Sequence, residues 1–212
     1  MPLDFSPQFH KIYDEINKKH PDAFRQSTGK SDARRIPTGY FQVDRRLGGG
    51  LPVNRVVLVY GPKGCFKTTI ALRAVANWQK RCGLCLEYRE KCTCQPLAEG
   101  ASKPSIAVFI DSEHALDEGH ATLRLGVDPE RFYVVHPPNG EAACEYAERL
   151  AKVPDVGMII QDSLASFVPE AELEKGFMDP MARGLRARLI ARMYRAMITN
   201  IDSVQFPRLC IM

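Results

Sequence analysis

The 212-residue sequence has no long hydrophobic run and no strong excess of charge of either sign. Because no stretch of about 18 consecutive apolar residues occurs, we expect no membrane-spanning segment and no membrane partner. The N-terminus has no signal-peptide core, and we therefore expect a cytoplasmic protein. Internal repeats and long low-complexity tracts are absent too. The formal charge of +4 indicates little about nucleic acid by itself, so only a local basic cluster would argue for such a partner.

Hydrophobic residues make up 45% of the chain and charged residues 25%, which are the proportions of a soluble globular protein. A chain of this length accommodates one sizeable domain with small appendages. Seven cysteines in a cytoplasmic protein argue against a disulfide framework. Four of the seven lie within thirteen residues and require an explanation of their own.

From residue 36 onward, apolar runs alternate with helical patterns, which predicts an α/β fold with a parallel sheet flanked by helices. The expected strands are Val56–Tyr60, Ile106–Ile110, Phe132–His136, Val156–Ile160 and a last one that begins at Phe206. Helices are expected to begin at Lys67-Thr68-Thr69, to follow an Asn139 cap and to span Leu185–Ile201. The chain stops within the last apolar run. Because a core strand rarely ends a protein, we expect residues 36–212 to be a truncated core.

Residues 1–35 form a separate segment, predicted to be a short N-terminal helix and a linker. Ser6-Pro7 is a typical helix start, and His20-Pro21 ends the pattern. Four apolar residues share one face of this helix: Phe9, Ile12, Tyr13 and Ile16. Packing on its own domain and docking on a neighbouring subunit both fit such a face.

The stretch that follows the first predicted strand indicates a phosphate-binding loop. The expected nucleotide-binding residues are Gly61, Pro62, Lys63, Gly64, Cys65, Phe66, Lys67, Thr68 and Thr69. In such a loop, successive backbone N–H groups and the N-terminus of the next helix face a phosphate. Lys67 would reach the β- and γ-phosphates of ATP, and Thr68 would place its hydroxyl on Mg²⁺. Phe66 stands where the consensus has glycine, and a helical φ/ψ would direct its side chain away from the nucleotide.

Two further strand ends carry carboxylates. Asp162 is suited to hold Mg²⁺ through water, and Glu113 is suited to orient or deprotonate an attacking water. Either carboxylate alone would more often be a helix cap. Together with the loop, they predict ATP and Mg²⁺ as ligands, because the carboxyl ends of parallel strands meet at one edge of the sheet.

Several motifs then follow one another in a fixed order. They are Ile36-Pro37-Thr38-Gly39-Tyr40, Asp44, Leu47-Gly48-Gly49-Gly50-Leu51-Pro52, Tyr60-Gly61-Pro62, residues 109–117 (FIDSEHALD), Leu125-Gly126-Val127-Asp128, Gln161-Asp162-Ser163-Leu164-Ala165 and residues 169–174 (PEAELE). This series resembles the core of the RecA recombinase family, over about residues 36 to 201. The resemblance implies a RecA-like P-loop ATPase core and an ATP-dependent recombinase. Such a protein forms a filament on single-stranded DNA and promotes strand pairing in recombination and repair.

The resemblance also implies roles for single residues. Glu113 matches the catalytic glutamate, with Lys67 beside the phosphates, and Asp117 matches the acid that contacts adenine. His120 occupies the place where the family often has a tyrosine stacked on the base. Ser163 follows the Mg²⁺ aspartate as it does in the family.

Residues 174–188 correspond to the first DNA-binding loop of that family and the helix after it. The predicted single-stranded-DNA contacts are Phe177, Met178, Arg183, Arg186 and Arg188, a mixture of apolar wedges and cations suited to single strands. A solvated basic helix face is the alternative, because Arg188, Arg192 and Arg195 share one side of the helix. The resemblance favours DNA binding for residues 183–188 but not for Arg192 or Arg195.

A cysteine-rich insert at residues 82–103 interrupts the span between the loop helix and the next strand. Cys82, Cys85, Cys92 and Cys94 form a Cys-x2-Cys, x6, Cys-x-Cys array. Four thiolates at this spacing would complete a tetrahedral Zn²⁺ site. Reduced cysteines without a metal are the alternative, and a redox pair at Cys82 and Cys85 has no thioredoxin-like surroundings. Cys65, Cys144 and Cys210 are expected to bind nothing, although alkylation of Cys65 should block nucleotide.

Three functions remain in view. The first is a DNA-dependent ATPase of the recombinase class. The second is a nucleotide-binding DNA or filament-assembly factor without effective hydrolysis, motivated by the expected truncation. The third, a related helicase or clock-type ATPase, fits the phosphate loop but not the sequence of residues 113–117.

Overall fold

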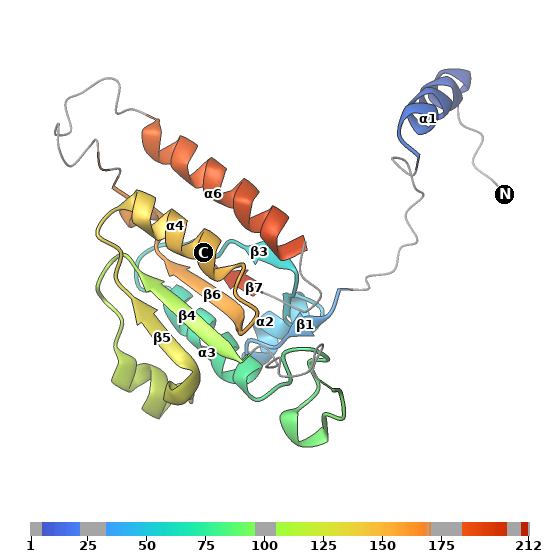
Figure 1. Ribbon diagram of the computed structural model, residues 1–212. Coiled ribbons are helices and arrows are strands. Elements are labelled where there is room, and N and C mark those ends of the chain that lie inside the picture. The colour runs from blue at the N-terminus through green and yellow to red at the C-terminus, as the bar shows by residue number, and fades with distance from the viewer. Residues whose placement is uncertain are drawn as a thin grey trace. The chain divides into compact units, whose positions relative to one another are not determined.

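The computed structural model describes residues 6–21, 33–95, 105–168, 170, 184–202 and 209–211. The chain divides into two compact units, residues 1–32 and residues 33–212. The predicted division fell between residues 35 and 36. Figure 1 shows the smaller unit as one helix and the larger one as a sheet with helices on both of its faces.

The smaller unit contains helix α1 (Pro7–Lys19), whose predicted start and end are both confirmed. The hydroxyl of Ser6 accepts a hydrogen bond from the backbone N–H of Phe9 at 3.3 Å, which satisfies one of the free donors of the first turn. Lys18 and Lys19 lie in the last turn, where positive charge complements the helix dipole. The helix buries none of its residues, so its apolar face keeps a large accessible surface.

The larger unit begins with a small antiparallel pair, β1 (Arg35–Ile36) with β2 (Leu51–Pro52). Helix α2 (Phe41–Arg46) lies between them in sequence. The carboxylate of Asp44 accepts hydrogen bonds from Thr38 N at 2.7 Å and from Gly39 N at 3.1 Å. These bonds fix the turn that leads into α2.

The main sheet is parallel throughout, as the alternation of apolar runs and helical patterns predicts. Its strands are β3 (Arg55–Val57), β4 (Ile106–Asp111), β5 (Phe132–Val135), β6 (Val156–Asp162) and β7 (Leu209–Ile211). Their order across the sheet is β3-β7-β6-β4-β5. The fold class is therefore confirmed as α/β with a parallel sheet.

Two strand predictions need correction. The first strand ends at Val57 rather than Tyr60, because β3 pairs only with the three-residue β7 among the described residues. Leu58 and Tyr60, which the pattern placed inside the sheet, are largely exposed. In the other direction, β6 continues to Asp162, because its register with β4 extends as far as the pair Asp111 and Asp162.

Helices cover both faces of the sheet (Figure 1). Helix α3 (Lys67–Gln79) packs on one face, and α4 (Gly140–Leu150) and α6 (Leu185–Asp202) pack on the other. The alternation within β4 divides the core between them: Phe109 packs with α3, whereas Val108 and Ile110 pack with α4 and α6. Both faces of the central strands are thus buried, which explains their continuous apolar sequences.

One close approach fixes α3 on the sheet. Gly157 of β6 faces the indole of Trp78, and a Cβ at this glycine would lie 2.2 Å from Cζ2 of the ring. The fully buried Trp78 therefore requires glycine at residue 157, because any side chain would push α3 off the sheet.

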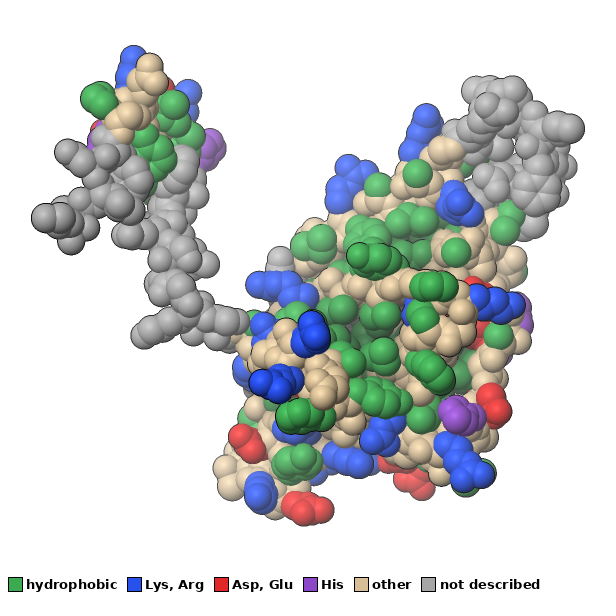
Figure 2. All heavy atoms as spheres, turned by 180° about the vertical axis from the view of Figure 1, so that it is seen from behind, with side chains coloured by type: hydrophobic (Ala, Val, Ile, Leu, Met, Phe, Trp, Pro, Cys, Tyr) green, Lys and Arg blue, Asp and Glu red, His purple; other side chains and the backbone are tan. Residues whose placement is uncertain are grey.

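Short turns complete the larger unit: η1 (Arg89–Lys91), the π-helical turn η2 (His120–Arg124), η3 (Pro129–Arg131) and η4 (Leu164–Ser166). Figure 2 shows hydrophobic side chains gathered across the middle of one face of this unit. Among the described helices, none is long and apolar enough to span a bilayer.

Candidate functional site

The predicted phosphate loop connects β3 to α3, and Lys67 is the first residue of that helix. Its ammonium group donates hydrogen bonds to the carbonyl oxygens of Gly61 at 3.0 Å and Pro62 at 2.9 Å. The lysine side chain therefore folds back over the loop instead of extending into solvent. This conformation places a positive charge beside the N-terminus of α3, where the helix dipole also favours an anion.

Phe66 adopts a backbone conformation different from the helical one predicted for it. Its φ of 63° and ψ of 25° lie in the left-handed region, immediately before the first residue of α3. An L-residue pays roughly 1–2 kcal/mol for this conformation, whereas glycine adopts it freely. The consensus glycine thus reflects the backbone angle at this residue. The Phe66 side chain is 72% exposed, so little packing compensates for the strain.

Thr68 and Asp162 meet at the base of the loop. The Thr68 hydroxyl, in the first turn of α3, donates a hydrogen bond to Oδ2 of Asp162, the last residue of β6. Burial raises the pKa of the Asp162 carboxyl above its ordinary value, and the hydrogen bond from Thr68 opposes that rise. The negative charges of Glu113 and Asp111 raise this pKa further. A cation next to Asp162 would therefore relieve an unfavourable concentration of negative charge.

Glu113 lies beyond the end of β4 and faces the residue that follows Asp162. Its Oε1 accepts a hydrogen bond from the hydroxyl of Ser163. The glutamate is exposed, so a water molecule has access to its carboxylate. The strand ends of β4 and β6 thus bring together two carboxylates and a hydroxyl, as expected for neighbouring parallel strands.

Asp111, to which the sequence pattern assigned no role, is a buried carboxylate that holds the residues after β4 in place. Asp111 is 2% exposed and accepts hydrogen bonds from the backbone N–H groups of Glu113 and Leu116, each at 3.1 Å. The ring of His136 lies 3.4 Å from the Asp111 carbonyl oxygen and stacks on His114 with 4.7 Å between centroids. The sequence does carry a signal for this role, because Asp111 ends an apolar strand and a second acidic residue, Glu113, follows two residues later.

The phosphate loop, Glu113, Asp162 and Ser163 line one cavity of about 810 Å³. Its lining includes Gly61, Lys63, Gly64, Cys65, Phe66, Lys67, Thr68, Thr69, Glu113, Asp162 and Ser163. Every predicted loop residue except Pro62 therefore contributes, together with both predicted strand-end carboxylates. A volume of this order accommodates a cofactor-sized ligand.

The two residues assigned to the base by resemblance do not line this cavity. Asp117 accepts a hydrogen bond from the backbone N–H of His120, the first residue of η2, at 2.8 Å. Both side chains are exposed. Asp117 therefore has a local structural use, whatever ligand it contacts.

The predicted DNA contacts divide into two groups. Phe177, Met178 and Arg183 lie outside the described residues. Arg186 and Arg188 lie in the first turn of α6, and both are exposed. The guanidinium of Arg186 donates to the carbonyl of Ala165 at 3.2 Å, and Ala165 also lines the cavity.

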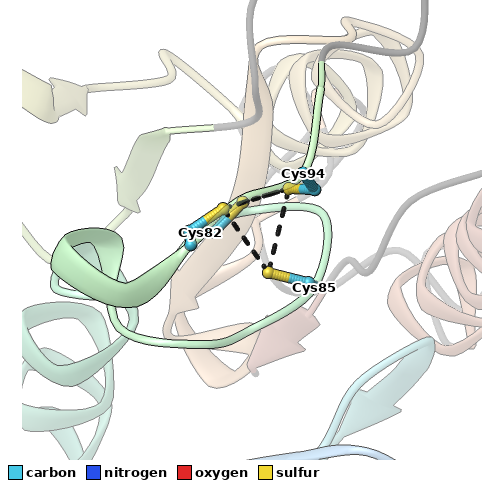
Figure 3. A group of neighbouring side chains, drawn as sticks. Cys82, Cys85 and Cys94 are labelled. Atoms are coloured by element: carbon cyan, nitrogen blue, oxygen red, sulfur yellow. Dashed lines mark hydrogen bonds between the residues drawn. The ribbon is translucent and has the colours of Figure 1, made fainter.

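The four clustered cysteines converge on one point, and Figure 3 shows the side chains of Cys82, Cys85 and Cys94 pointing toward one another. Their sulfur atoms lie within 4.8 Å of one another. Hydrogen bonds from Cys94 and Cys82 lower the pKa of Cys92 to about 6. Hydrogen bonding to Cys92 and Cys82 raises the pKa of Cys94 to about 12. The cluster therefore favours one thiolate hydrogen-bonded by its neighbours. The other members are Cys82, which is buried, and Cys85, whose pKa burial raises.

A parallel sheet with a glycine-containing loop and carboxylates at its carboxyl edge places the chain among α/β proteins whose sites lie at the strand ends. The chain matches the RecA N-terminal domain family over residues 11–90 and 89–211. The chain therefore belongs to the RecA family.

Several curated relatives carry the name Protein RecA. The one from Picosynechococcus sp. is 39% identical over 166 residues, which are 78% of this chain and 41% of that protein. The one from Cutibacterium acnes is 37% identical over 193 residues, or 89% of this chain and 49% of the relative. The one from Bifidobacterium breve is 41% identical over 163 residues, which are 76% of this chain and 36% of that protein. The chain thus spans less than half the length of these relatives.

Proposed function

We propose that this chain binds ATP with Mg²⁺ in the 810 Å³ cavity and acts as a DNA-dependent ATPase of the recombinase class. The observation that carries the proposal is the convergence of Lys67, the Thr68–Asp162 pair and Glu113 on that one cavity. A cation, a carboxylate–hydroxyl pair and an exposed carboxylate at one sheet edge are the parts that phosphoryl transfer to water requires.

The donor set fits Mg²⁺. Thr68 and Asp162 supply oxygen atoms only, and Mg²⁺ is typically bound by one or two carboxylates together with substrate phosphates. Burial, together with the charges of Glu113 and Asp111, raises the pKa of Asp162, so a cation bound there would favour the charged carboxylate. Bound there, Mg²⁺ would neutralise phosphate charge.

Lys67, Glu113 and Ser163 would each have a separate role in hydrolysis. The Lys67 ammonium, held by two loop carbonyls, would exchange those acceptors for phosphate oxygens. Glu113 would orient the attacking water and accept its proton. The Ser163 hydroxyl would hold the Glu113 carboxylate in position through the hydrogen bond to Oε1.

Single-stranded DNA is the proposed partner, and a homo-oligomeric filament along it is the proposed assembly, for strand pairing in recombination and repair. Arg186 and Arg188 support a DNA contact at the start of α6, because exposed guanidinium groups bind phosphates without regard to sequence. The hydrogen bond from Arg186 to Ala165 supports coupling between the nucleotide site and the DNA contact, since Ala165 belongs to the turn that follows Asp162 and Ser163. A shift of this turn on nucleotide binding would move Arg186.

The experiment is an ATPase assay of the chain with and without single-stranded DNA, beside equilibrium nucleotide binding. Turnover should rise with DNA and disappear in Glu113→Gln, while binding persists. Glu118→Gln, which neutralises an exposed carboxylate outside the cavity, is the matched control and should keep turnover. Unchanged turnover in Glu113→Gln would contradict its role. Nucleotide binding without hydrolysis in the unmodified chain would instead support the filament-assembly factor.

A further inference from the structure

The loop at residues 82–95 has little to hold it together. Apart from the three-residue turn η1 and the isolated bridge between Arg81 and Tyr88, these residues form no regular secondary structure. Only Cys82, Gly83 and Leu86 are buried. A segment this poor in buried apolar surface needs a cross-link or a metal to keep one conformation.

The four sulfur atoms are spaced as the ligands of a single small ion would be. The contacts are 3.3 Å for Cys82–Cys94, 3.6 Å for Cys85–Cys92, 3.1 Å for Cys92–Cys94 and 3.8 Å for Cys85–Cys94. Zinc–sulfur bonds of about 2.3 Å in a regular tetrahedron separate the sulfurs by about 3.8 Å. An expansion of a few tenths of an ångström on average would therefore fit zinc among the four.

The arrangement disfavours the alternatives. A four-iron cluster binds each cysteine through a different iron, so the cluster would hold the four sulfurs farther apart than the 4.8 Å that bounds them here. None of these four described cysteines is in a disulfide, and even the 3.1 Å contact between the sulfurs of Cys92 and Cys94 is much longer than a disulfide bond of about 2.05 Å. The backbone N–H of Leu84 also points to the sulfur of Cys82 at 3.4 Å, an interaction that stabilises a metal-bound thiolate.

The loop is attached to the C-terminal end of α3, the helix whose N-terminus forms the phosphate loop. Arg89 donates through Nε to the carbonyl of Gln79 at 2.8 Å and through its backbone N–H to Lys80 at 3.0 Å. Gln79 in turn binds the backbone of Asp128 and Arg131 through its buried side chain. Order in the cysteine loop is thus transmitted to the junction of α3 with η3.

We propose that Cys82, Cys85, Cys92 and Cys94 bind one structural zinc ion, which orders residues 82–95 and fixes them to the end of α3. All four positions are filled by protein sulfur, so no coordination site remains for a substrate, as in structural rather than catalytic zinc sites. The proposal does not depend on nucleotide binding.

The test is the metal content of the purified chain, measured by mass spectrometry after preparation without chelators. About one zinc per chain is expected. The double variant Cys92→Ser/Cys94→Ser should lose it, while Cys65→Ser, which alters an exposed cysteine outside the cluster, should keep it. Iron in place of zinc, or a folded chain with no metal, would overturn the proposal. So would full zinc content in the double variant.

A second measurement covers the case in which the double variant fails to fold. Cobalt(II) added to the metal-stripped, otherwise unmodified chain should give the intense absorption of thiolate-to-cobalt charge transfer, saturating at one equivalent. Zinc should then displace the cobalt. Absence of that absorption from a chain that circular dichroism shows to be folded would overturn the assignment.

Hydrogen exchange gives a readout of the ordering itself. The amides of Cys82, Leu86 and Lys91 are bonded within the loop or its turn, to Glu87, Cys82 and Tyr88. Their exchange should be slow with zinc and accelerate at least about tenfold when the metal is removed. Equal exchange in both states would contradict a structural role for the ion.

Discussion

The Thr68 hydroxyl donates its hydrogen bond to Asp162 across 94 residues of sequence. The pair joins the first turn of α3 to the end of β6, so each side chain depends on the other element for its position. Because the loop, Asp162 and Glu113 line the same cavity, this bond is the structural centre of the proposed Mg²⁺–nucleotide site.

Thr68→Ala should weaken Mg²⁺-nucleotide binding by about tenfold, or about 1.4 kcal/mol, because it removes both an oxygen donor and the bond that orients Asp162. Thr68→Ser keeps the hydroxyl and should bind nearly as well as the unmodified chain. Titration calorimetry with and without Mg²⁺ measures the difference. Equal affinities for the alanine and serine variants would show that the hydroxyl has no part in the site.

Asp162 predicts a pH dependence of stability. Its pKa is raised in the folded chain, chiefly by burial, so the folded state holds this proton more tightly than the unfolded state does. The resulting stabilisation is fully present below the ordinary value of 3.8 and is lost as pH rises through the folded-state pKa. Asp162→Asn should remove this component. Urea unfolding of both chains between about pH 4 and 7 measures it, and parallel curves would argue against it.

Nucleotide binding should depend on pH in the opposite sense over the same window. A carboxyl group must lose its proton to face Mg²⁺, so affinity for Mg²⁺-nucleotide should rise as pH passes the raised pKa of Asp162. Binding without Mg²⁺ should lack this rise. An identical pH profile with and without the metal would remove Asp162 from the metal site.

Phe66→Gly should stabilise the chain slightly. It relieves a left-handed backbone cost of roughly 1–2 kcal/mol and loses little packing, because the ring is exposed. The added freedom of the unfolded chain offsets about 0.4–1 kcal/mol of this gain. Phe66→Ala is the matched control: it removes the ring but keeps the strain. A glycine variant no more stable than the alanine variant would show that φ at this residue carries no cost.

Alkylation should distinguish Cys65, in the phosphate loop, from Cys144, in α4. Burial raises the pKa of the Cys144 thiol to about 12, so it should resist iodoacetamide in the folded chain. Cys65 is exposed and lines the cavity, so it should react, and its modification should block nucleotide. Mass spectrometry locates the label. Bound nucleotide should protect Cys65, and labelling unaffected by nucleotide would place the ligand elsewhere.

Patterns in the sequence predicted helices α1, α3, α4 and α6, the parallel class of the sheet and the carboxylates at its edge, but not helix α2. They did so because apolar periodicity reports burial directly and parallel strands share one carboxyl edge. The cysteine spacing likewise predicted a cluster, and all four sulfurs converge.

The sequence pattern could not predict contacts between segments that are distant in sequence. The order β3-β7-β6-β4-β5 depends on pairing between distant segments, which leaves no local signal. The buried polar side chains of Asp111 and Gln79 were given no role. Asp111 resembles the end of its apolar strand, and Gln79 binds backbone groups 49 and 52 residues away in sequence, which leaves no local signal. Phe66 was assigned a helical conformation, although the consensus glycine at its position already indicated a positive φ.

The most direct test of the account is nucleotide binding by Lys67→Ala compared with the unmodified chain and with Lys63→Ala. Lys67 makes the hydrogen bonds that fold it over the loop, whereas Lys63 lines the same cavity with no such bond among the described contacts. The account predicts saturable, Mg²⁺-dependent binding of an ATP analogue that Lys67→Ala abolishes and Lys63→Ala largely retains. Binding undiminished in a folded Lys67→Ala chain, or absent from the folded unmodified chain, would contradict it.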